Sequence, residues 1–169
     1  MKLLFIGDSL IEYYDWQERF SKYLVYNLGI AGETVEGLYA RLEVVFAQIE
    51  EADAIFIMTG INNLAMGDSK FLPVYRKIVK SLKEHYTPSR IFLHSLLPVL
   101  FPWISNDEIV KMNRQLKKMA GEENVLYVDM HSLFLEREGR PVREYLLDDG
   151  VHVSEKGYRV WAGEIERLL

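Results

Sequence analysis

Short apolar runs recur along the chain at similar intervals, and segments with helical periodicity separate them. Each run is nearly continuous rather than alternating, which is typical of a strand covered on both faces. The five runs are Leu3–Ile6, Val25–Leu28, Ala54–Met58, Ile91–Leu93 and Val125–Val128. Strands that alternate with helices indicate βαβ units joined by right-handed crossovers. The pattern therefore predicts an α/β protein, a three-layer α/β/α sandwich around a five-stranded parallel sheet.

Four helices are expected around these runs. The segment from Thr34 to Ala52 carries apolar residues at a spacing of 3.6 and predicts one long amphipathic helix. The other three begin at expected capping residues, namely Ser69 for a helix to Leu82, Asn106 for one to Met119, and Ser154 for the last. No internal repeat, low-complexity tract or linker interrupts the pattern. With 169 residues, this predicts a single domain over positions 1–169.

Composition narrows the class of protein. The chain has 20 Lys and Arg against 25 Asp and Glu, a net charge of −5, and no dense basic cluster, so we expect no nucleic-acid partner. It has no cysteine, which excludes disulfides, thiolate nucleophiles and Cys-ligated zinc. No run approaches the roughly 20 apolar residues of a membrane span. The first run stops at Gly7, well short of the roughly 7–15 residues of a signal-peptide core. We therefore expect a cytoplasmic protein with no stable membrane anchor.

Polar or glycine-bearing segments follow the predicted strands. In an open parallel sheet, ligands bind at the carboxyl ends of the strands, so these segments are expected to meet at one edge. They are Gly7–Leu10, Gly29–Gly32, Gly60–Asn63 and Leu96–Pro98, with Asp149–His152 just before the last helix.

One pair of these segments offers a nucleophile and a base. Ser9 directly follows the first strand, and His152 could accept its proton if a carboxylate held the other ring nitrogen. Asp149 lies three residues before His152, and Asp148 is a competing partner. The alternative interpretations are that Ser9 only caps a helix and that the Asp–His loop is solvated.

An acyl-transfer site also needs donors for the developing oxyanion. Gly32 can offer a backbone N–H that no side chain blocks, Asn62 its side-chain amide, and Ser9 its own N–H. Taken singly, Gly32 and Asn62 could equally be ordinary turn residues.

Together these segments resemble the SGNH, or GDSL, hydrolase family over essentially the whole chain. The residues that match its blocks are the nucleophile Ser9 in G-D-S-L, the oxyanion glycine Gly32, Gly60 and Asn62 of G-x-N-D, and Asp149 and His152 of D-x-x-H. The segment Leu96–Pro98, followed by Ile109 and Asn113, looks like the small bacterial acetylesterase-like branch. The resemblance implies the flavodoxin-like SGNH fold and a serine esterase that needs no metal or organic cofactor.

In the implied reaction, Ser9 attacks an ester carbonyl, His152 takes its proton and Asp149 stabilises the imidazolium. An acyl-enzyme forms and water releases it. One departure from the family is Asn63, which stands where the family usually has Asp. The lost charge is expected to affect the support of Asn62 more than activity itself.

The substrate side is less specific in the sequence. The apolar segment Leu96–Ile104 contains two prolines and is either a buried loop, a lip over the site or a contact in a homodimer. Tyr13, Tyr14 and Trp16 could form the facing wall or simply pack the first helix. Substrate contacts are expected from Leu10, Tyr13, Asn63, Leu97 and Trp103.

Short connections favour a compact site and small acyl esters. Acetyl esters of carbohydrates come first, and short-chain carboxylesters, thioesters and lysophospholipid are alternatives. Two different classes of protein also fit the pattern. One is a catalytically silent binding module on the same fold, and the other is a metal hydrolase that uses Asp8, Asp149 and His152.

Overall fold

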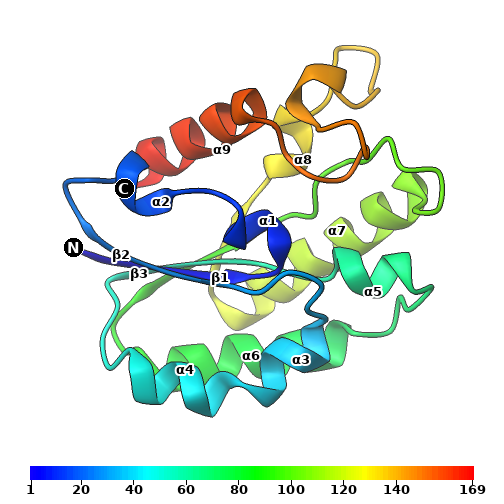
Figure 1. The fold of residues 1–169 in the computed structure, drawn as a ribbon. Helices are drawn as coiled ribbons and strands as arrows, with labels where there is room; N and C mark the ends of the chain where they lie inside the picture. Colours follow the sequence, from blue (N-terminus) through cyan, green and yellow to red (C-terminus); the bar gives the residue numbers. More distant parts are fainter.

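A single parallel sheet organises the chain, and the computed structural model describes residues 1–169 (Figure 1). The strands are β1 (Lys2–Gly7), β2 (Leu24–Gly29), β3 (Ala54–Met58), β4 (Arg90–His94) and β5 (Leu126–Val128). All four neighbouring pairs are parallel, in the order β2-β1-β3-β4-β5. The chain reverses its direction of travel between β2 and β3, so the ends of β1 and β3 flank the point where a ligand is expected.

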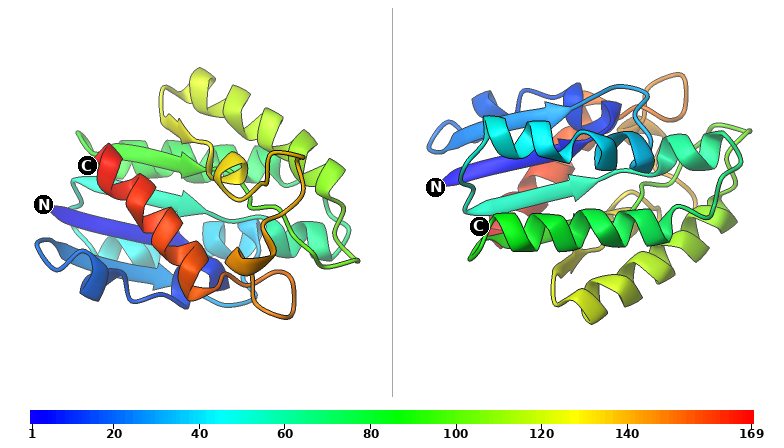
Figure 2. Two further views of the ribbon diagram at one scale, coloured as in Figure 1. Left: turned by 90° about the horizontal axis from the view of Figure 1, so that it is seen from above. Right: turned by 90° about the horizontal axis from the view of Figure 1, so that it is seen from below.

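Helices cover both faces of the sheet, as Figures 1 and 2 show. One face carries α3 (Val35–Ala40), α4 (Leu42–Gln48), α6 (Leu72–His85) and α7 (Asn106–Glu123). The other carries α1 (Ser9–Glu12), α2 (Trp16–Arg19), α8 (Met130–Leu133) and α9 (Glu155–Leu168). The short helices α5 (Ile61–Ala65) and η1 (Arg143–Tyr145) lie beyond the carboxyl ends of the strands. The predicted three-layer architecture is confirmed.

The core is centred on the two innermost strands. Every residue of β3 is buried, and so is β1 apart from its first residue. A stack of aromatic rings crosses the sheet. The ring centroid of Phe5 lies 4.4 Å from that of Trp16 and 4.8 Å from that of Phe56, and the centroids of Phe56 and Phe92 are 4.9 Å apart. Trp16 is fully buried in this stack, so of its two expected roles it has the packing one and does not wall the substrate site.

The boundaries of three predicted helices differ from those observed. The segment expected as one helix from Thr34 to Ala52 is two helices, α3 and α4, that meet at Arg41. Phe71, not Ser69, occupies the N-cap of α6, where its buried ring packs against Gly60. These departures follow from tertiary contacts that local spacing does not encode.

The last two predicted caps have different outcomes. Ser105 caps α7, because the Asn106 side chain instead bonds both the N–H and the carbonyl of Val99. Ser154 caps α9 as expected, since its Oγ accepts from the Gly157 N–H at 3.2 Å. No helix of the structure has the length and the apolar character that crossing a membrane requires.

Candidate active site

The end of β1 presents Ser9 at the start of a helix. A side chain at Gly7 would put its Cβ 1.9 Å from the Met58 carbonyl oxygen, so only glycine lets β1 approach β3 so closely here. Asp8 is the N-cap of α1, and its Oδ1 accepts from the Leu10 N–H at 3.0 Å. Because Asp8 caps the helix, the interpretation of Ser9 as merely a capping residue is wrong. Ser9 is instead the first residue of α1 and is 6% exposed.

A continuous line of contacts joins Ser9 to the loop before α9. The Ser9 Oγ lies 3.1 Å from His152 Nε2, and His152 Nδ1 lies 2.6 Å from Asp149 Oδ2. Asp148, the competing partner, turns away and pairs with Arg143 at 3.1 Å. The three side chains thus have the mutual geometry of a nucleophile, a base and a group that orients the base.

Several hydrogen bonds hold Asp149 in its ionised form. Its Oδ1 accepts from the backbone N–H groups of Val151 and His152, each at 2.9 Å. Partial burial raises the pKa of Asp149, but the bonds from the His152 ring and from these N–H groups outweigh it and lower the pKa to about 2. A fixed carboxylate charge therefore faces the imidazole.

The loop that carries the His and Asp is clamped by the segment after β4. Gly150 has a φ of +74°, and an added Cβ would lie 2.8 Å from the Leu100 carbonyl carbon. The Leu100 N–H donates to the Gly150 carbonyl at 2.8 Å. A glycine is thus required at the one position that lets the two segments touch.

The two expected oxyanion donors follow β2 and β3, the strands on either side of β1. Gly32 has a φ of +75°, its N–H donates to no protein acceptor, and open space surrounds its Cα. Asn62, on α5, uses one amide hydrogen to bond the Glu33 carbonyl at 2.9 Å, which leaves the other free. The Ser9 N–H opens α1, where backbone donors lack helical partners.

An ion pair that sequence reasoning missed fixes the loop that carries Gly32. Arg41 bonds both carboxylate oxygens of Glu33, at 2.6 and 2.8 Å, and the Leu28 carbonyl at 2.7 Å. It therefore bridges the end of β2 and the far end of the loop. Nothing in the local sequence signals this bridge, because it depends on how α3 ends and α4 begins.

Asn63 has a role different from the one expected. It is 1% exposed, its Oδ1 accepts from the Val35 N–H, and its Nδ2 donates to Glu36 and Asp68. The expected substrate contact is wrong, since no polar atom of Asn63 is left for a ligand. An Asp here would face two further carboxylates, whereas the Asn63 amide binds both and lowers the pKa of Asp68. No hydrogen bond links Asn63 to the Asn62 side chain.

The other expected substrate contacts divide by burial. Leu10 and Leu97 are each only 2% exposed and belong to the core, so they offer almost no surface to a ligand. Tyr13 is 58% exposed, and its ring centroid lies 5.3 Å from that of His152. Trp103 is 79% exposed at the tip of the segment after β4, most of whose apolar residues are buried.

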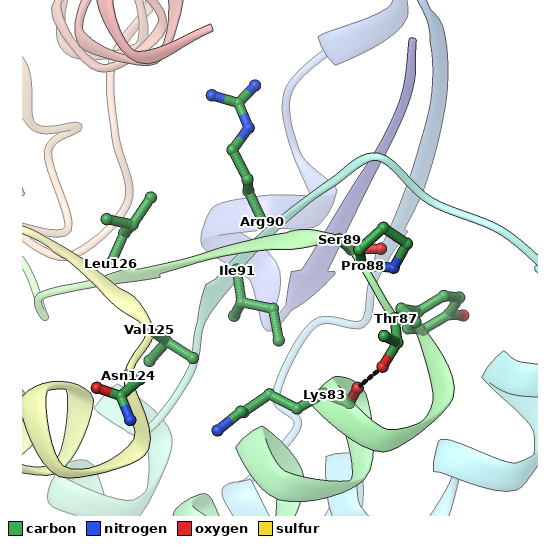
Figure 3. A pocket seen from close by; sticks show the side chains of 10 residues that line it. Lys83, Thr87, Pro88, Ser89, Arg90, Ile91, Asn124, Val125 and Leu126 are labelled. Atoms are coloured by element: carbon green, nitrogen blue, oxygen red, sulfur yellow. Dashed lines mark hydrogen bonds between the residues drawn. The ribbon is translucent and has the colours of Figure 1, made fainter.

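One cavity lies far from this site along the chain's sheet and does not belong to it. Figure 3 shows a cavity of about 320 Å³ whose lining includes Lys83, Pro88, Arg90 and Leu126. Because Arg90 and Leu126 begin β4 and β5, this cavity lies at the amino edge of the sheet, opposite Ser9. No group of three or more His, Asp or Glu side chains is arranged to hold a metal ion.

Comparisons with known proteins show what the whole chain is similar to. The profile of the GDSL-like lipase/acylhydrolase family matches residues 5–160. The chain is 24% identical to human (Homo sapiens) platelet-activating factor acetylhydrolase IB subunit alpha1, over 99% of this chain and 75% of that protein. A solved structure from Streptococcus pneumonia superposes with a TM-score of 0.87, at 28% identity, covering 98% of this chain and 82% of that one. The solved structure of an acetylxylan esterase from Geobacillus stearothermophilus superposes with a TM-score of 0.79 at 25% identity. The match covers 98% of this chain and 92% of that one.

Proposed function

Because this chain belongs to the GDSL-like lipase/acylhydrolase family and is a carboxylic ester hydrolase, we propose that it is a serine esterase for short-chain acyl esters, acetyl esters above all. The observation that carries the proposal is the line from Ser9 through His152 to Asp149, with contacts of 3.1 and 2.6 Å. A silent binding module would have no use for a carboxylate that orients the ring.

In the proposed reaction, the Ser9 oxygen attacks the ester carbonyl while His152 Nε2 accepts the hydroxyl proton. The carbonyl oxygen becomes an oxyanion, which the N–H groups of Ser9 and Gly32 and the free amide hydrogen of Asn62 stabilise. The imidazolium then gives its proton to the leaving alkoxide. The acyl-enzyme that remains is cleaved by water, which His152 deprotonates in turn. Asp149 stays ionised throughout, in keeping with its low pKa.

The acyl preference rests on the names of two relatives and on the compact connections around Ser9. An acetylhydrolase subunit and an acetylxylan esterase both match nearly the whole chain, and both names refer to acetyl groups. The same acyl-enzyme chemistry would serve a thioester or a lysophospholipid, and the ester series below distinguishes acyl groups by their length. A small acetyl ester, including one on a carbohydrate, is the substrate class we favour.

The proposal is tested with a p-nitrophenyl ester series from acetyl to palmitoyl, using the wild type and Ser9→Ala side by side. We expect activity on acetate that falls with chain length and disappears in Ser9→Ala. Labelling of Ser9 by a fluorophosphonate, read by intact-mass spectrometry, checks the nucleophile without relying on any ester. A folded protein that neither hydrolyses these esters nor takes the label would contradict the proposal, and a maximum at long chains would reject the acetyl preference.

A further inference from the structure

The proposed reaction determines on which side of Ser9 the alcohol part of the ester lies. His152 must donate its proton to the leaving oxygen, so the alcohol leaves along the His152 ring. The oxyanion donors Gly32 and Asn62 belong to other loops, after β2 and β3. The exposed side chain packed on the His152 ring is Tyr13, with ring centroids 5.3 Å apart. Tyr13 is therefore an exposed side chain on the side of Ser9 from which the alcohol leaves.

Tyr13 is one of the residues that line a cavity of about 600 Å³. It lies between the segment that joins α1 to α2 and the first turns of α9, which follow His152 directly (Figure 1). Its lining combines Tyr13 and Tyr14 with the charged side chains of Glu18, Glu155 and Arg159, among others. No aliphatic side chain lines it, and its only hydrophobic lining residues are the two tyrosines.

Most hydrogen-bonding groups around this cavity are unused by the protein. The Glu18 carboxylate and the hydroxyls of Tyr13 and Tyr14 have no partner in the chain. Arg159 uses only its Nε, which donates to Glu155 Oε1 at 3.2 Å. Both terminal amino groups of its guanidinium are left free to donate. Hydrogen-bond donors and acceptors, of positive and of negative charge, thus line the same cavity, as a ligand with many hydroxyl groups requires.

Tyr14 provides a rigid flat wall. One face of its ring stacks on Tyr158, with centroids 4.4 Å apart and an angle of 12°, and Trp16 packs against it in a T-shaped arrangement with centroids 4.8 Å apart. Because Tyr158 and Trp16 are buried, this wall is held in place by the core. An amphipathic ring beside charged hydrogen-bonding groups suits a sugar ring, which has apolar C–H faces and a polar edge.

We propose that the cavity between Tyr13 and Arg159 is the subsite for the alcohol part of the substrate, and that this alcohol is polyhydroxylated, as in an O-acetylated sugar. The inference rests on the proposed esterase function and adds to it the place and the chemistry of the leaving group. A fatty alcohol would meet only the two tyrosine rings there, with no aliphatic side chain to pack against.

The experiment compares kcat/KM on a mono-O-acetylated methyl xyloside with kcat/KM on ethyl acetate, whose alcohol is too small to reach Arg159. We expect the ratio of the two to fall about tenfold in Glu18→Gln and in Arg159→Gln, since each loses charged hydrogen bonds to hydroxyl groups. Arg114→Gln is the matched control, on the exposed surface of α7 across the sheet, and should keep the wild-type ratio. Both tested side chains are exposed, so their loss does not threaten folding.

A second measurement uses only the wild type. Unacetylated xylotriose should inhibit ethyl acetate hydrolysis competitively, and 1-octanol at the same concentration should not. Unchanged ratios in both variants, together with no inhibition by xylotriose, would overturn the subsite while leaving the esterase intact. A preference for an acetyl ester with a phosphocholine or alkyl alcohol would overturn its polyol chemistry. A protein inactive on ethyl acetate and unlabelled at Ser9 would instead overturn the proposed function itself.

Discussion

At the scale of single residues, Asp8 sits beside the nucleophile and is fully buried. Its Oδ1 caps α1, whereas its Oδ2 has no hydrogen-bond partner. Burial raises the pKa of Asp8 from 3.8 to about 7, although the Leu10 N–H and the positive charge of a protonated His152 pull it down. The folded protein therefore keeps this carboxyl partly protonated at neutral pH.

This raised pKa predicts a pH-dependent cost in stability. Between pH 4 and 7 the unfolded chain has released the Asp8 proton, whereas the folded chain retains it. Because the folded state binds more protons, the free energy of unfolding falls as pH rises, and the contribution of the protonated group is lost once pH passes about 7. Asp8→Asn cannot titrate and keeps a capping oxygen. We expect the variant to melt several degrees above the wild type at pH 8, and the gap to shrink towards pH 4.

Thermal unfolding at pH 4, 6 and 8 measures that gap. Asp15→Asn, at the exposed N-cap of α2, is the matched control for removing a capping charge. A gap between Asp8→Asn and the wild type that stays constant with pH would contradict the assignment of the cost to ionisation of Asp8.

At the scale of elements, the break between α3 and α4 supports the site. Arg41 ends one helix and begins the other, and from there it bonds Glu33 and the Leu28 carbonyl. Glu33 in turn accepts from Asn62 through its backbone carbonyl. A straight helix through Arg41 would fit the apolar spacing better, yet the broken one ties the proposed oxyanion loop at both ends. The local irregularity thus coincides with the site.

Arg41 is expected to act as a positioning residue for the oxyanion donors. Asn62→Ala alone should lower kcat by roughly 10²–10³, the usual cost of one lost donor. Arg41→Ala should also lower kcat, by about tenfold or more, because the loop loses its anchor. In the double variant the two effects should not multiply, since Arg41 acts through the same donors. Arg41→Lys should recover only part of the loss, because an ammonium cannot bond both oxygens of Glu33 as a guanidinium does.

The measurement is kcat on an acetyl ester for the wild type, the two single alanine variants and the double variant, with the melting temperature of each recorded alongside. Arg76→Ala, on α6, which covers the opposite face of the sheet from α1, removes another guanidinium that binds two carboxylates, Glu122 and Glu123. It should change the melting temperature and leave kcat alone. Independent, multiplicative effects of Arg41→Ala and Asn62→Ala would reduce Arg41 to a purely structural role.

At the scale of the whole molecule, the last helix, α9, lies over one face of the sheet and packs against the first part of the chain (Figure 2). It begins just after His152, and its Tyr158 hydroxyl donates to the Leu10 carbonyl at 2.9 Å, across 148 positions of sequence. Tyr158 is also stacked on Tyr14 and Trp161. This helix therefore fixes the base-bearing loop against the helix that carries Ser9.

Removal of that one hydroxyl tests the connection. Tyr158→Phe keeps the ring and leaves the buried Leu10 carbonyl without this donor, which should cost about 1 kcal/mol of unfolding free energy. That corresponds to roughly 2–4 °C in melting temperature for a chain of this size. Tyr39→Phe, on a ring 41% exposed, is the control and should melt with the wild type. Equal melting temperatures for all three proteins would show that the bond adds no net stability.

Much of the fold and of the candidate site was predictable from sequence because both depend on local patterns. The five apolar runs, their alternation with helices and the order of the glycine-bearing blocks determined a parallel sheet with Ser9, Gly32, Asn62 and His152 at one edge. Burial on both faces of a strand leaves a continuous apolar run, and parallel strands all end on the same side. The spacing between Asp149 and His152 is short enough for the local turn to bring the two side chains together.

Only the tertiary structure decided which distant groups meet. Trp16 could have faced a ligand, but it stacks on Phe5. Asn63 resembled a defective family position, but it binds two carboxylates that the sequence places 27 and 5 residues away. The break at Arg41 coincides with an ion pair to Glu33 that no helical period contains. Periodicity determines which face of an element is buried, whereas the partner of each side chain is set only when loops close and the elements pack.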